Sequence, residues 1–373
     1  MTVSDFFAHL NEQHTHHLPF VAYRKPSEQS VSAILQNNDA LLTVTDYSES
    51  GFVFAPYDID QPAVIIQGQK IVTSHFDSTF KDEKELTEFN STEEEKQKHV
   101  DLVQKALKTI EKSALQKVVL SREQICSLKS TDVLRIFKSL LQQYERAFVY
   151  IFYHPRVGLW LGATPETLLS LKRNRLKTMA LAGTQEYKGT LNVEWGAKEK
   201  EEQQLVVDEI CSKLNEIGVK NLKKSPRMTQ KAGNIMHLST EIDAVLDEKS
   251  PDVSEIIGAL HPTPAVCGLP RELAKEFIAQ HETYDRTYYT GFLGEFNLES
   301  INHRSGNKRN TENLAYRAIT TSTDLFVNLR CMQIKDNTSH IYVGGGITKS
   351  SVPEDEWEET CAKARTMTKV LLN

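Results

Sequence analysis

The sequence predicts an α+β fold, a single large domain over residues 1–373 in which mainly antiparallel β-sheets pack together and are flanked by helices. Three observations lead to this prediction. The chain has 373 residues, of which 39% are hydrophobic, so it can bury a substantial core. Short apolar runs separated by turn residues dominate residues 1–80, which is typical of antiparallel strands. Helices and hairpins then alternate without a regular βαβ rhythm, which argues against a doubly wound parallel sheet.

The first part of the chain predicts strands that lead into one helix. Apolar runs bounded by turn residues predict strands at 21–23, 40–44, 51–55, 63–66 and 70–72. The charged stretch 81–97 predicts a solvated loop that runs into a helix. Val100, Val103, Leu107 and Ile110 recur at helical spacing, so we expect an amphipathic helix over about 92–113.

The remaining elements follow from the same signals. We expect a strand at 116–121, a helix at 132–145 that Thr131 could cap, and a hairpin over 147–161 that turns at His154 and Pro155. A strand pair follows at 168–171 and 176–181. Long helices are predicted over about 197–217 and 353–372, the second with Pro353 in its first turn.

Composition excludes several classes of protein. Lys plus Arg is 44 and Asp plus Glu is 50, a formal net charge of −6, so we expect no nucleic-acid partner and no anionic membrane surface. The longest apolar run, Ala147–Tyr153, is far too short to span a membrane, and the N-terminus does not resemble a secretory signal. The five cysteines are widely spaced and form no CxxC pair, which favours a reducing cytoplasm without disulfides. No long apolar stripe demands a partner, so we expect a monomer.

Two of the predicted helices carry carboxylates at helical spacing. Glu202 heads a stripe that continues through Val206 and Ile210, although first-turn acids of this kind are often only favourable charges at a helix start. Glu356, Glu359 and Lys363 share a face of the last helix, where such pairs are usually surface decoration. Together the two helices could form an oxygen-ligand Mg²⁺ site, but spacing alone does not show that they face each other.

Three further features could carry chemistry. Lys117 lies inside an apolar run and either points to solvent by alternation or is buried, where loss of solvation would make it a usable base. Glu166 follows Thr164 and Pro165; it is either a turn residue or a carboxylate kept protonated as an acid. The glycines 344–346 follow a strand and permit close approach of an anion to the backbone.

Taken together, these segments resemble the chorismate-utilising enzyme family, which includes anthranilate synthase component I, salicylate synthase and aminodeoxychorismate synthase. The resemblance covers roughly residues 110–370, whereas residues 1–100 match weakly and form a variable N-terminal part. The matching motifs, in the family's order, are KVVLSRE (117–123), LGATPETLL (161–169), MALAGT (179–184), KEKEEQQLVVDEI (198–210), HLSTEI (237–242), LHPTPAVCGLP (260–270), YDRTYYTGFLGEF (284–296), VNLRCMQI (327–334) and VGGGITKSSVPEDEWEETCAK (343–363).

The resemblance implies a Mg²⁺-dependent pocket between the packed sheets and assigns expected roles to its residues. Lys117 matches the base and Glu166 the general acid. Glu202 and Glu359 match the Mg²⁺ ligands, with Glu356 as a possible further ligand. Substrate-binding positions are matched by His237, Thr240, Ala265, Tyr289, Arg330, Gly344, Gly345, Gly346 and Lys363. One departure is Gln203, where many members have His after the metal-binding Glu.

The resemblance also implies an activity, namely the isomerase that forms isochorismate. Members that use a covalent lysine nucleophile carry Lys where this chain has Ala182, and those that use ammonia lack the lysine at 117. Lys117 with Ala182 therefore points to water as the nucleophile attacking chorismate. Salicylate synthases tend to carry Thr at position 265, so Ala265 favours stopping at isochorismate, for menaquinone or siderophore biosynthesis. Salicylate synthase, which adds pyruvate elimination, and a non-catalytic binding protein of the same shape remain the alternatives.

Overall fold

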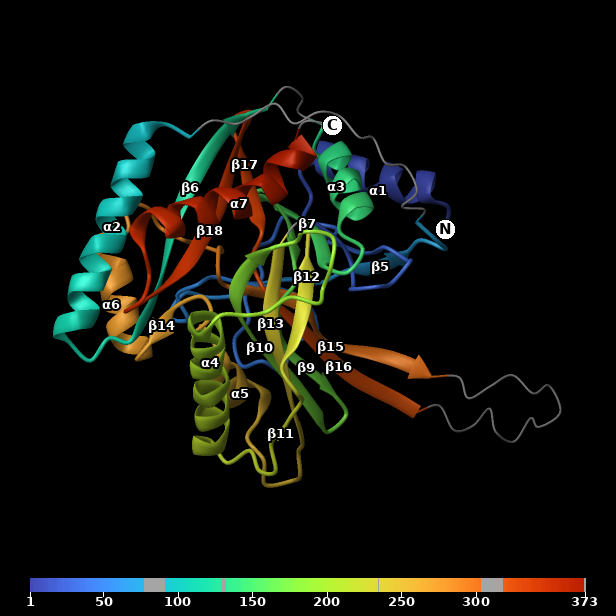
Figure 1. The fold of residues 1–373 in the computed structure, drawn as a ribbon. Helices are drawn as coiled ribbons and strands as arrows, with labels where there is room; N and C mark the ends of the chain where they lie inside the picture. The colour runs from blue at the N-terminus through green and yellow to red at the C-terminus, as the bar shows by residue number, and fades with distance from the viewer. Residues whose placement is uncertain (77–90, 129–131, 234, 303–317, 372–373) are drawn as a thin grey trace.

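Two large antiparallel sheets lie at the centre of the protein, and helices cover them (Figure 1). The computed structural model describes residues 1–76, 91–128, 132–233, 235–302 and 318–371. The predicted α+β class with packed antiparallel sheets is confirmed.

The described part of the chain contains seven helices and eighteen strands. The helices are α1 (Val3–Thr15), α2 (Glu93–Lys112), α3 (Val133–Gln143), α4 (Ala197–Glu216), α5 (Val253–Leu260), α6 (Arg271–His281) and α7 (Pro353–Leu371). The strands are β1 (Phe20–Arg24), β2 (Ser32–Leu35), β3 (Gly51–Ala55), β4 (Val64–Ile66), β5 (Gln69–Val72), β6 (Lys117–Ser127), β7 (Phe148–His154), β8 (Gly158–Thr164), β9 (Thr167–Lys172), β10 (Arg175–Glu186), β11 (Lys223–Lys224), β12 (Met228–Ala232), β13 (Ile235–Val245), β14 (Gly268–Leu269), β15 (Phe292–Asn302), β16 (Ala318–Val327), β17 (Cys331–Lys335) and β18 (Thr338–Thr348).

Strands from both halves of the chain are interleaved in each sheet. The first sheet has the order β14-β6-β18-β17-β8-β7-β1-β2-β5, and the second has the order β11-β13-β10-β9-β16-β15-β3-β4, with β12 beside β13. Strands β6 and β18 pair along their whole length, from Lys117 opposite Thr348 to Ser127 opposite Thr338. This pairing places the glycines 344–346 beside the strand that begins at Lys117, although more than 200 residues separate them in sequence.

Aromatic side chains fill the space between the sheets. The rings of Phe54 on β3 and Phe152 on β7 stack with centroids 4.4 Å apart, and those of Phe148 and Phe326 lie 4.2 Å apart. Such pairs add stacking energy to a large buried apolar area. The inter-sheet contact therefore includes a buried aromatic layer.

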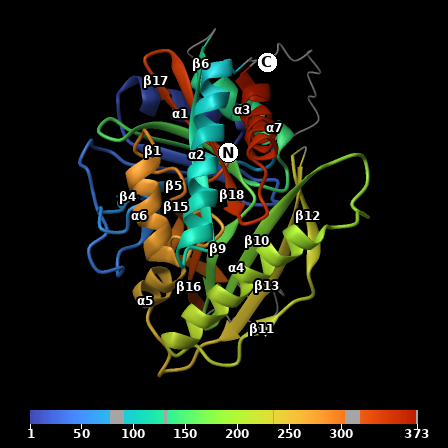
Figure 2. The same ribbon diagram turned by 60° about the vertical axis from the view of Figure 1, so that its left-hand side comes forward.

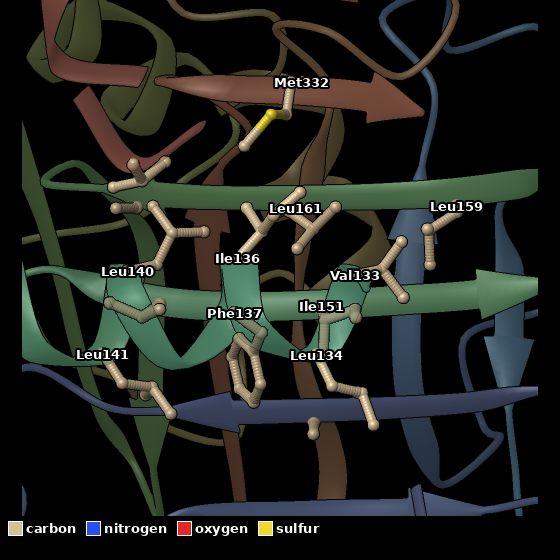
Figure 3. Close-up of a cluster of buried hydrophobic side chains, with 14 of the residues drawn as sticks. Val133, Leu134, Ile136, Phe137, Leu140, Leu141, Ile151, Leu159, Leu161 and Met332 are labelled. Carbon is tan, nitrogen blue, oxygen red and sulfur yellow. The ribbon is translucent and has the colours of Figure 1, made fainter. Parts of the chain in front are cut away.

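Helices bury their apolar faces on the outer sides of the sheets. Helix α3 lays Phe137 and Leu140 over Ile151 and Leu161 of strands β7 and β8 (Figure 3). Helix α4 lies along β10 and β13 of the second sheet (Figure 2). Because α4 and α7 cover different sheets, the two helices that carry the candidate carboxylates approach the same region from different sides.

The long helices begin and end close to where the sequence predicts. Helix α2 begins after the Thr92 cap, and α4 and α7 agree with prediction within one or two residues. Helix α3 begins at Val133, one residue late, because the Asp132 side chain accepts the Arg135 backbone N–H at 3.1 Å and is the N-cap. The predicted Thr131 cap and the loop residues 81–90 lie outside the described residues.

Other predictions of secondary structure were incomplete. Segment 40–44 is not a strand, because its pairing with β4 is limited to one bridge, between Thr43 and Val64. Helix α1 was not predicted, although Phe6 and Leu10, four residues apart, mark its buried face. Helices α5 and α6 and most strands after residue 220 were also missed.

Two composition-based expectations can be compared with the structure. The five cysteines are free, as their spacing predicts. Among the helices that the structure describes, none is both long and apolar enough to cross a membrane.

Candidate active site

One cavity brings together almost all of the candidate residues. It is bounded by β6, the β8–β9 turn, β10, α4, β13, β18 and α7, with the loops around 265, 289 and 330. The predicted site residues that line it are Glu166, Glu202, His237, Ala265, Tyr289, Arg330, Gly344, Gly345, Gly346, Glu359 and Lys363. Of the predicted set, Lys117, Glu356 and Thr240 lie just behind its wall.

The glycines of β18 give this cavity its room. A Cβ atom at Gly346 would lie 2.5 Å from Oε1 of Glu202 and 2.9 Å from Cε of Lys117. A Cβ atom at Gly345 would lie 3.4 Å from Oε2 of Glu356 and 3.7 Å from Oε1 of Glu359. A side chain at position 346 would therefore displace a charged group, which explains why the strand carries glycine there.

Lys117 is buried, which decides between the two alternatives that the sequence left open. The first five residues of β6 are all buried, because the strand is covered on both faces, so alternation gives no guide to side-chain direction. Its Nζ lies 2.9 Å from Oε1 of Glu202. Its charge also acts on Glu166, so the amine and this carboxyl group lie within electrostatic reach of each other.

Glu166 is held in the protonated form. It is 2% exposed, and burial raises the pKa of its carboxyl group to about 8, while the hydroxyl of Thr263 and the charge of Lys117 oppose this shift. The Thr263 hydroxyl donates to Glu166 Oε1 at 3.3 Å. At neutral pH the group can therefore deliver a proton into the cavity.

Arg330 and His237 form a neutral–cationic pair on the cavity wall. Arg330 Nη2 donates to His237 Nε2 at 2.7 Å, so the histidine must donate from Nδ1 to the Gly183 carbonyl, also at 2.7 Å. Burial and the guanidinium lower the pKa of His237 to about 3. The backbone of Arg330 lies in the left-handed region, at φ +48°.

Each of the three predicted metal-ligating carboxylates is paired with a lysine. Besides the Lys117–Glu202 pair, Lys198 Nζ lies 2.8 Å from Glu356 Oε1 and Lys363 Nζ lies 2.6 Å from Glu359 Oε1. Lys363 also donates to the Gly344 carbonyl at 2.8 Å. Burial and repulsion from Glu359 raise the pKa of Glu356, whereas Lys363 outweighs burial and lowers the pKa of Glu359.

These residues have the chemistry of a Mg²⁺ site. Within the described ranges, no three His, Cys, Asp or Glu side chains converge closely enough to hold an ion unaided. Mg²⁺ commonly uses one or two carboxylates together with waters and substrate oxygens. Glu202 and Glu359 both line the cavity, and the glycine strand leaves space beside each carboxylate, so the donor set fits this ion.

Thr240, predicted to bind substrate, is not among the residues that line the cavity. Its hydroxyl accepts a hydrogen bond from Gln203 Nε2 at 2.9 Å, and Gln203 also accepts from Arg227. Thr240 therefore belongs to the packing between β13 and α4. Gln203, which stands where many members have His, directly follows Glu202. Its hydrogen bond to Thr240 ties this part of α4 to the second sheet.

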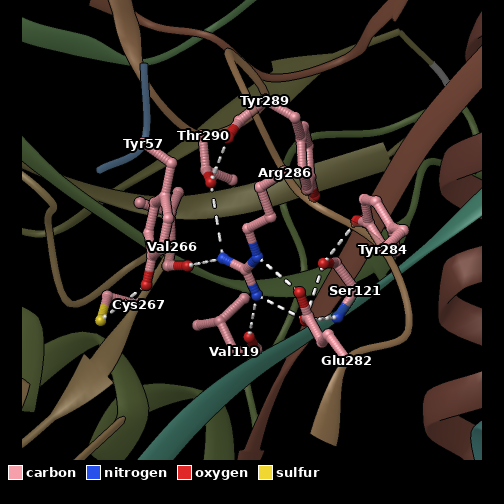
Figure 4. Close-up of polar contacts among 10 residues, drawn as sticks. All are labelled: Tyr57, Val119, Ser121, Val266, Cys267, Glu282, Tyr284, Arg286, Tyr289 and Thr290. Carbon is pink, nitrogen blue, oxygen red and sulfur yellow. Dashed lines mark hydrogen bonds and ion pairs between the residues drawn. The ribbon is translucent and has the colours of Figure 1, made fainter. Parts of the chain in front are cut away.

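Sequence reasoning missed a buried network behind the cavity (Figure 4). Arg286 pairs with Glu282 at 2.6 Å and donates to the carbonyls of Val119 and Val266. Both of these residues line the cavity, as does Thr290, which also lies within hydrogen-bonding distance of Arg286. Arg286 thus ties three segments of the wall together. It stands in the YDRTYYTG motif, but nothing in the sequence indicates which backbone groups it reaches.

Comparison with known proteins gives the class. The chain matches the family model described as chorismate binding enzyme over residues 55–302, and a second model of the same description over residues 314–369. The first match covers more than half of the chain, and the protein belongs to the chorismate-binding enzyme family.

Its relatives include named isochorismate synthases. The chain is 28% identical over 286 residues to isochorismate synthase DhbC of Bacillus subtilis, covering 72% of this chain and 66% of the relative. It is 30% identical over 276 residues to isochorismate synthase MenF of Escherichia coli, covering 70% of this chain and 57% of the relative. The matched region thus spans between about half and two thirds of these relatives.

Solved structures share the fold. MenF from Escherichia coli superposes with a TM-score of 0.72 at 22% identity, covering 95% of this chain and 89% of that one. DhbC from Bacillus anthracis superposes with a TM-score of 0.76 at 21% identity, covering 98% of this chain and 100% of that one. The first hundred residues, expected to be variable, are therefore part of the common fold.

Proposed function

We propose that this protein is an isochorismate synthase, an isomerase that moves the hydroxyl group of chorismate from C4 to C2. The observation that carries the proposal is the buried pair of a basic and an acidic group, Lys117 and Glu166, within reach of one cavity. The names of the DhbC and MenF relatives support it.

The reaction requires a base and an acid at the two ends of a conjugated system. Water oxygen bonds to C2 while its proton passes to the Lys117 side chain, which acts as the base in its neutral amine form. The ring double bonds shift, and the C4–O bond breaks. Glu166 gives its proton to the departing oxygen, so the leaving group is water and the product is an isomer of chorismate. Burial keeps Glu166 protonated for this step.

Binding the substrate requires compensation of its two carboxylates. Arg330 presents a guanidinium to the cavity, which suits bidentate pairing with a carboxylate, and Lys363 adds an ammonium group. Glu202 and Glu359, with Glu356 adjacent, would hold a Mg²⁺ ion. When bound, this ion supplies charge neutralisation for the ring carboxylate.

The cavity wall favours water as the nucleophile. Ala182 lines the cavity and cannot form the covalent bond that a lysine at this position makes in members resembling aminodeoxychorismate synthase. Ala265, also in the wall, favours release of isochorismate over pyruvate elimination. We assign the product to menaquinone or siderophore biosynthesis, and we propose a monomer that works in the cytoplasm.

Product identification tests the proposal. The protein is incubated with chorismate and Mg²⁺, and the products are separated by chromatography. We expect isochorismate without salicylate or pyruvate. Accumulation of fluorescent salicylate would instead assign a salicylate synthase, and unchanged chorismate would assign a binding protein. A parallel incubation with chelator is expected to stop the reaction, and full activity there would remove the metal from the proposal.

A further inference from the structure

Lys198 occupies an unusual place among the three carboxylates of the site. It is the second residue of α4, and its Nζ lies 2.8 Å from Oε1 of Glu356. Glu356 is 2% exposed, so an ammonium group from the surface of α4 reaches a deeply buried carboxylate. A buried carboxylate without a partner would be costly, and Lys198 removes this cost.

The charge of Lys198 is stabilised by all three carboxylates. Burial alone would lower the pKa of this amine, but the hydrogen bond to Glu356 and the charges of Glu356, Glu359 and Glu202 raise it. The ammonium group therefore lies in the negative field that a divalent cation would also seek.

The other two lysines of the site are held more firmly. The Lys117 side chain is 1% exposed, and Lys363 is fixed by a second hydrogen bond, to the Gly344 carbonyl. The side chain of Lys198 is 33% exposed. It lines a groove between α2 and α4, with Lys349 and Glu202 on the same groove. This groove gives the Lys198 side chain a way out and meets the cavity at Glu202.

We propose that Lys198 is an internal cation that occupies the carboxylate cluster in the metal-free protein and competes with the divalent ion. Entry of Mg²⁺ then requires the Lys198 ammonium to leave Glu356 and turn into the groove. Lys198 therefore lowers the affinity for the metal, and in the metal-free protein it reduces the repulsion among the carboxylates. The inference rests on the Mg²⁺ site of the proposed function. It adds that Lys198 determines how tightly this site binds Mg²⁺.

Calorimetric titration with Mg²⁺, in the absence of chorismate, tests the inference. We expect Lys198→Met to bind Mg²⁺ about tenfold more tightly than the wild-type protein, within the range of typical site–site couplings. The matched control is Lys349→Met, which removes the same charge from the same groove; this side chain is 76% exposed and lies 3.7 Å from Glu201. We expect less than a twofold change there.

Unchanged or weaker binding by Lys198→Met would overturn the inference, as would equal tightening in Lys349→Met, which would reveal only a long-range charge effect. Absence of binding in every variant would overturn it as well. Because no chorismate is present, these outcomes are separate from the product assay, which alone decides the proposed function.

Two further measurements distinguish competition with the metal from a loss of stability in Lys198→Met. Thermal unfolding without metal should show a lower Tm for Lys198→Met than for the wild type, because Glu356 loses its partner. Saturating Mg²⁺ should raise the Tm of Lys198→Met more than that of the wild type. Lys198→Arg retains the charge and should bind Mg²⁺ no more tightly than the wild type. Competition would be contradicted if Mg²⁺ raised the Tm of Lys198→Met and of the wild type equally. It would also be contradicted if Lys198→Arg bound Mg²⁺ more tightly than the wild type.

Discussion

Two clusters of lysines and carboxylates in this protein differ in how each carboxylate is neutralised. In the inter-sheet cluster, formed by Lys25, Lys70, Lys172, Glu295 and Asp324, each carboxylate contacts two lysine ammonium groups. In the active-site cluster, formed by Glu202, Glu356, Glu359 and their lysines, each carboxylate is paired with one.

The pKa directions in the two clusters differ at one carboxylate, Glu356. Burial would raise the pKa of Glu295 and Asp324, but the lysines outweigh it and keep both groups ionised. In the active-site cluster the directions diverge, because burial and repulsion from Glu359 raise the pKa of Glu356, whereas Lys363 lowers the pKa of Glu359. The inter-sheet cluster, with two lysines on each carboxylate, fastens the sheets together, whereas the active-site cluster, with one lysine on each carboxylate, lies beside the space that the glycines leave. The same residue types thus serve packing in one region and chemistry in the other.

The largest effect is expected from the proposed catalytic pair. Lys117→Met and Glu166→Gln should each lower kcat by about 10²–10⁴, because a positioned base or acid contributes a factor of this size. Steady-state turnover of chorismate measures this. Lys172→Met, in the inter-sheet cluster, is the control and should leave kcat unchanged. Near-normal turnover in either site variant would exclude that residue from proton transfer.

A smaller effect, on stability rather than rate, is expected in the inter-sheet cluster. Lys25→Met should lower the free energy of unfolding by about 3 kcal/mol, because it leaves Glu295 and Asp324 buried with less compensation. Urea denaturation measures this change, and kcat per folded molecule should be preserved. Lys172→Met, at a side chain that is 62% exposed, should cost less than about 1 kcal/mol. Equal losses in the two variants would contradict the distinction between buried and exposed partners.

The smallest effect is expected in the pH profile. Since the pKa of Glu166 is raised to about 8, the acid loses its proton as pH rises through this value, and kcat should fall there. Thr263→Val removes a donor that favours the carboxylate, so the descending limb should move upward by about 0.7 unit, equivalent to a hydrogen bond of about 1 kcal/mol. A limb that stays in place or moves downward would show that Thr263 does not act on the acid.

The same shift has a stability consequence with a defined sign. The raised pKa means that the folded protein retains a proton that the unfolded chain releases between pH 4.5 and about 8. The contribution of Glu166 is therefore complete below pH 4.5 and is lost as pH rises through 8. Glu166→Gln should flatten this part of the stability profile, which urea titrations across that range would reveal.

Local signals predicted much of the fold. Helices α2, α4 and α7 were predicted closely because the signals that mark them are local to each helix. Strand β3 was predicted at its observed bounds, Gly51–Ala55. The segment 40–44 was predicted wrongly, because a strand requires continued pairing with a neighbour and this segment makes only the single Thr43–Val64 bridge.

The site was predicted as a set of residues, not as an arrangement. Family motifs gathered most of the residues that line the cavity, but Thr240 lies behind the wall because Gln203 takes its hydroxyl. The sequence could not decide whether Lys117 is buried, since a strand covered on both faces shows no alternation. It also gave no sign that Lys198 reaches Glu356, because that contact joins α4 to α7 across 158 residues.

The pairing of β6 with β18 bears on how the protein acquires its activity. The groups that would carry out the reaction are scattered from Lys117 to Lys363, and the sheet connecting them closes through contacts between distant stretches of sequence. Loop closures of this length are slow steps in folding. During refolding, we expect helical structure to return early and turnover to return only once β6 and β18 have paired in register. Recovery of enzymatic activity therefore reports completion of the native topology.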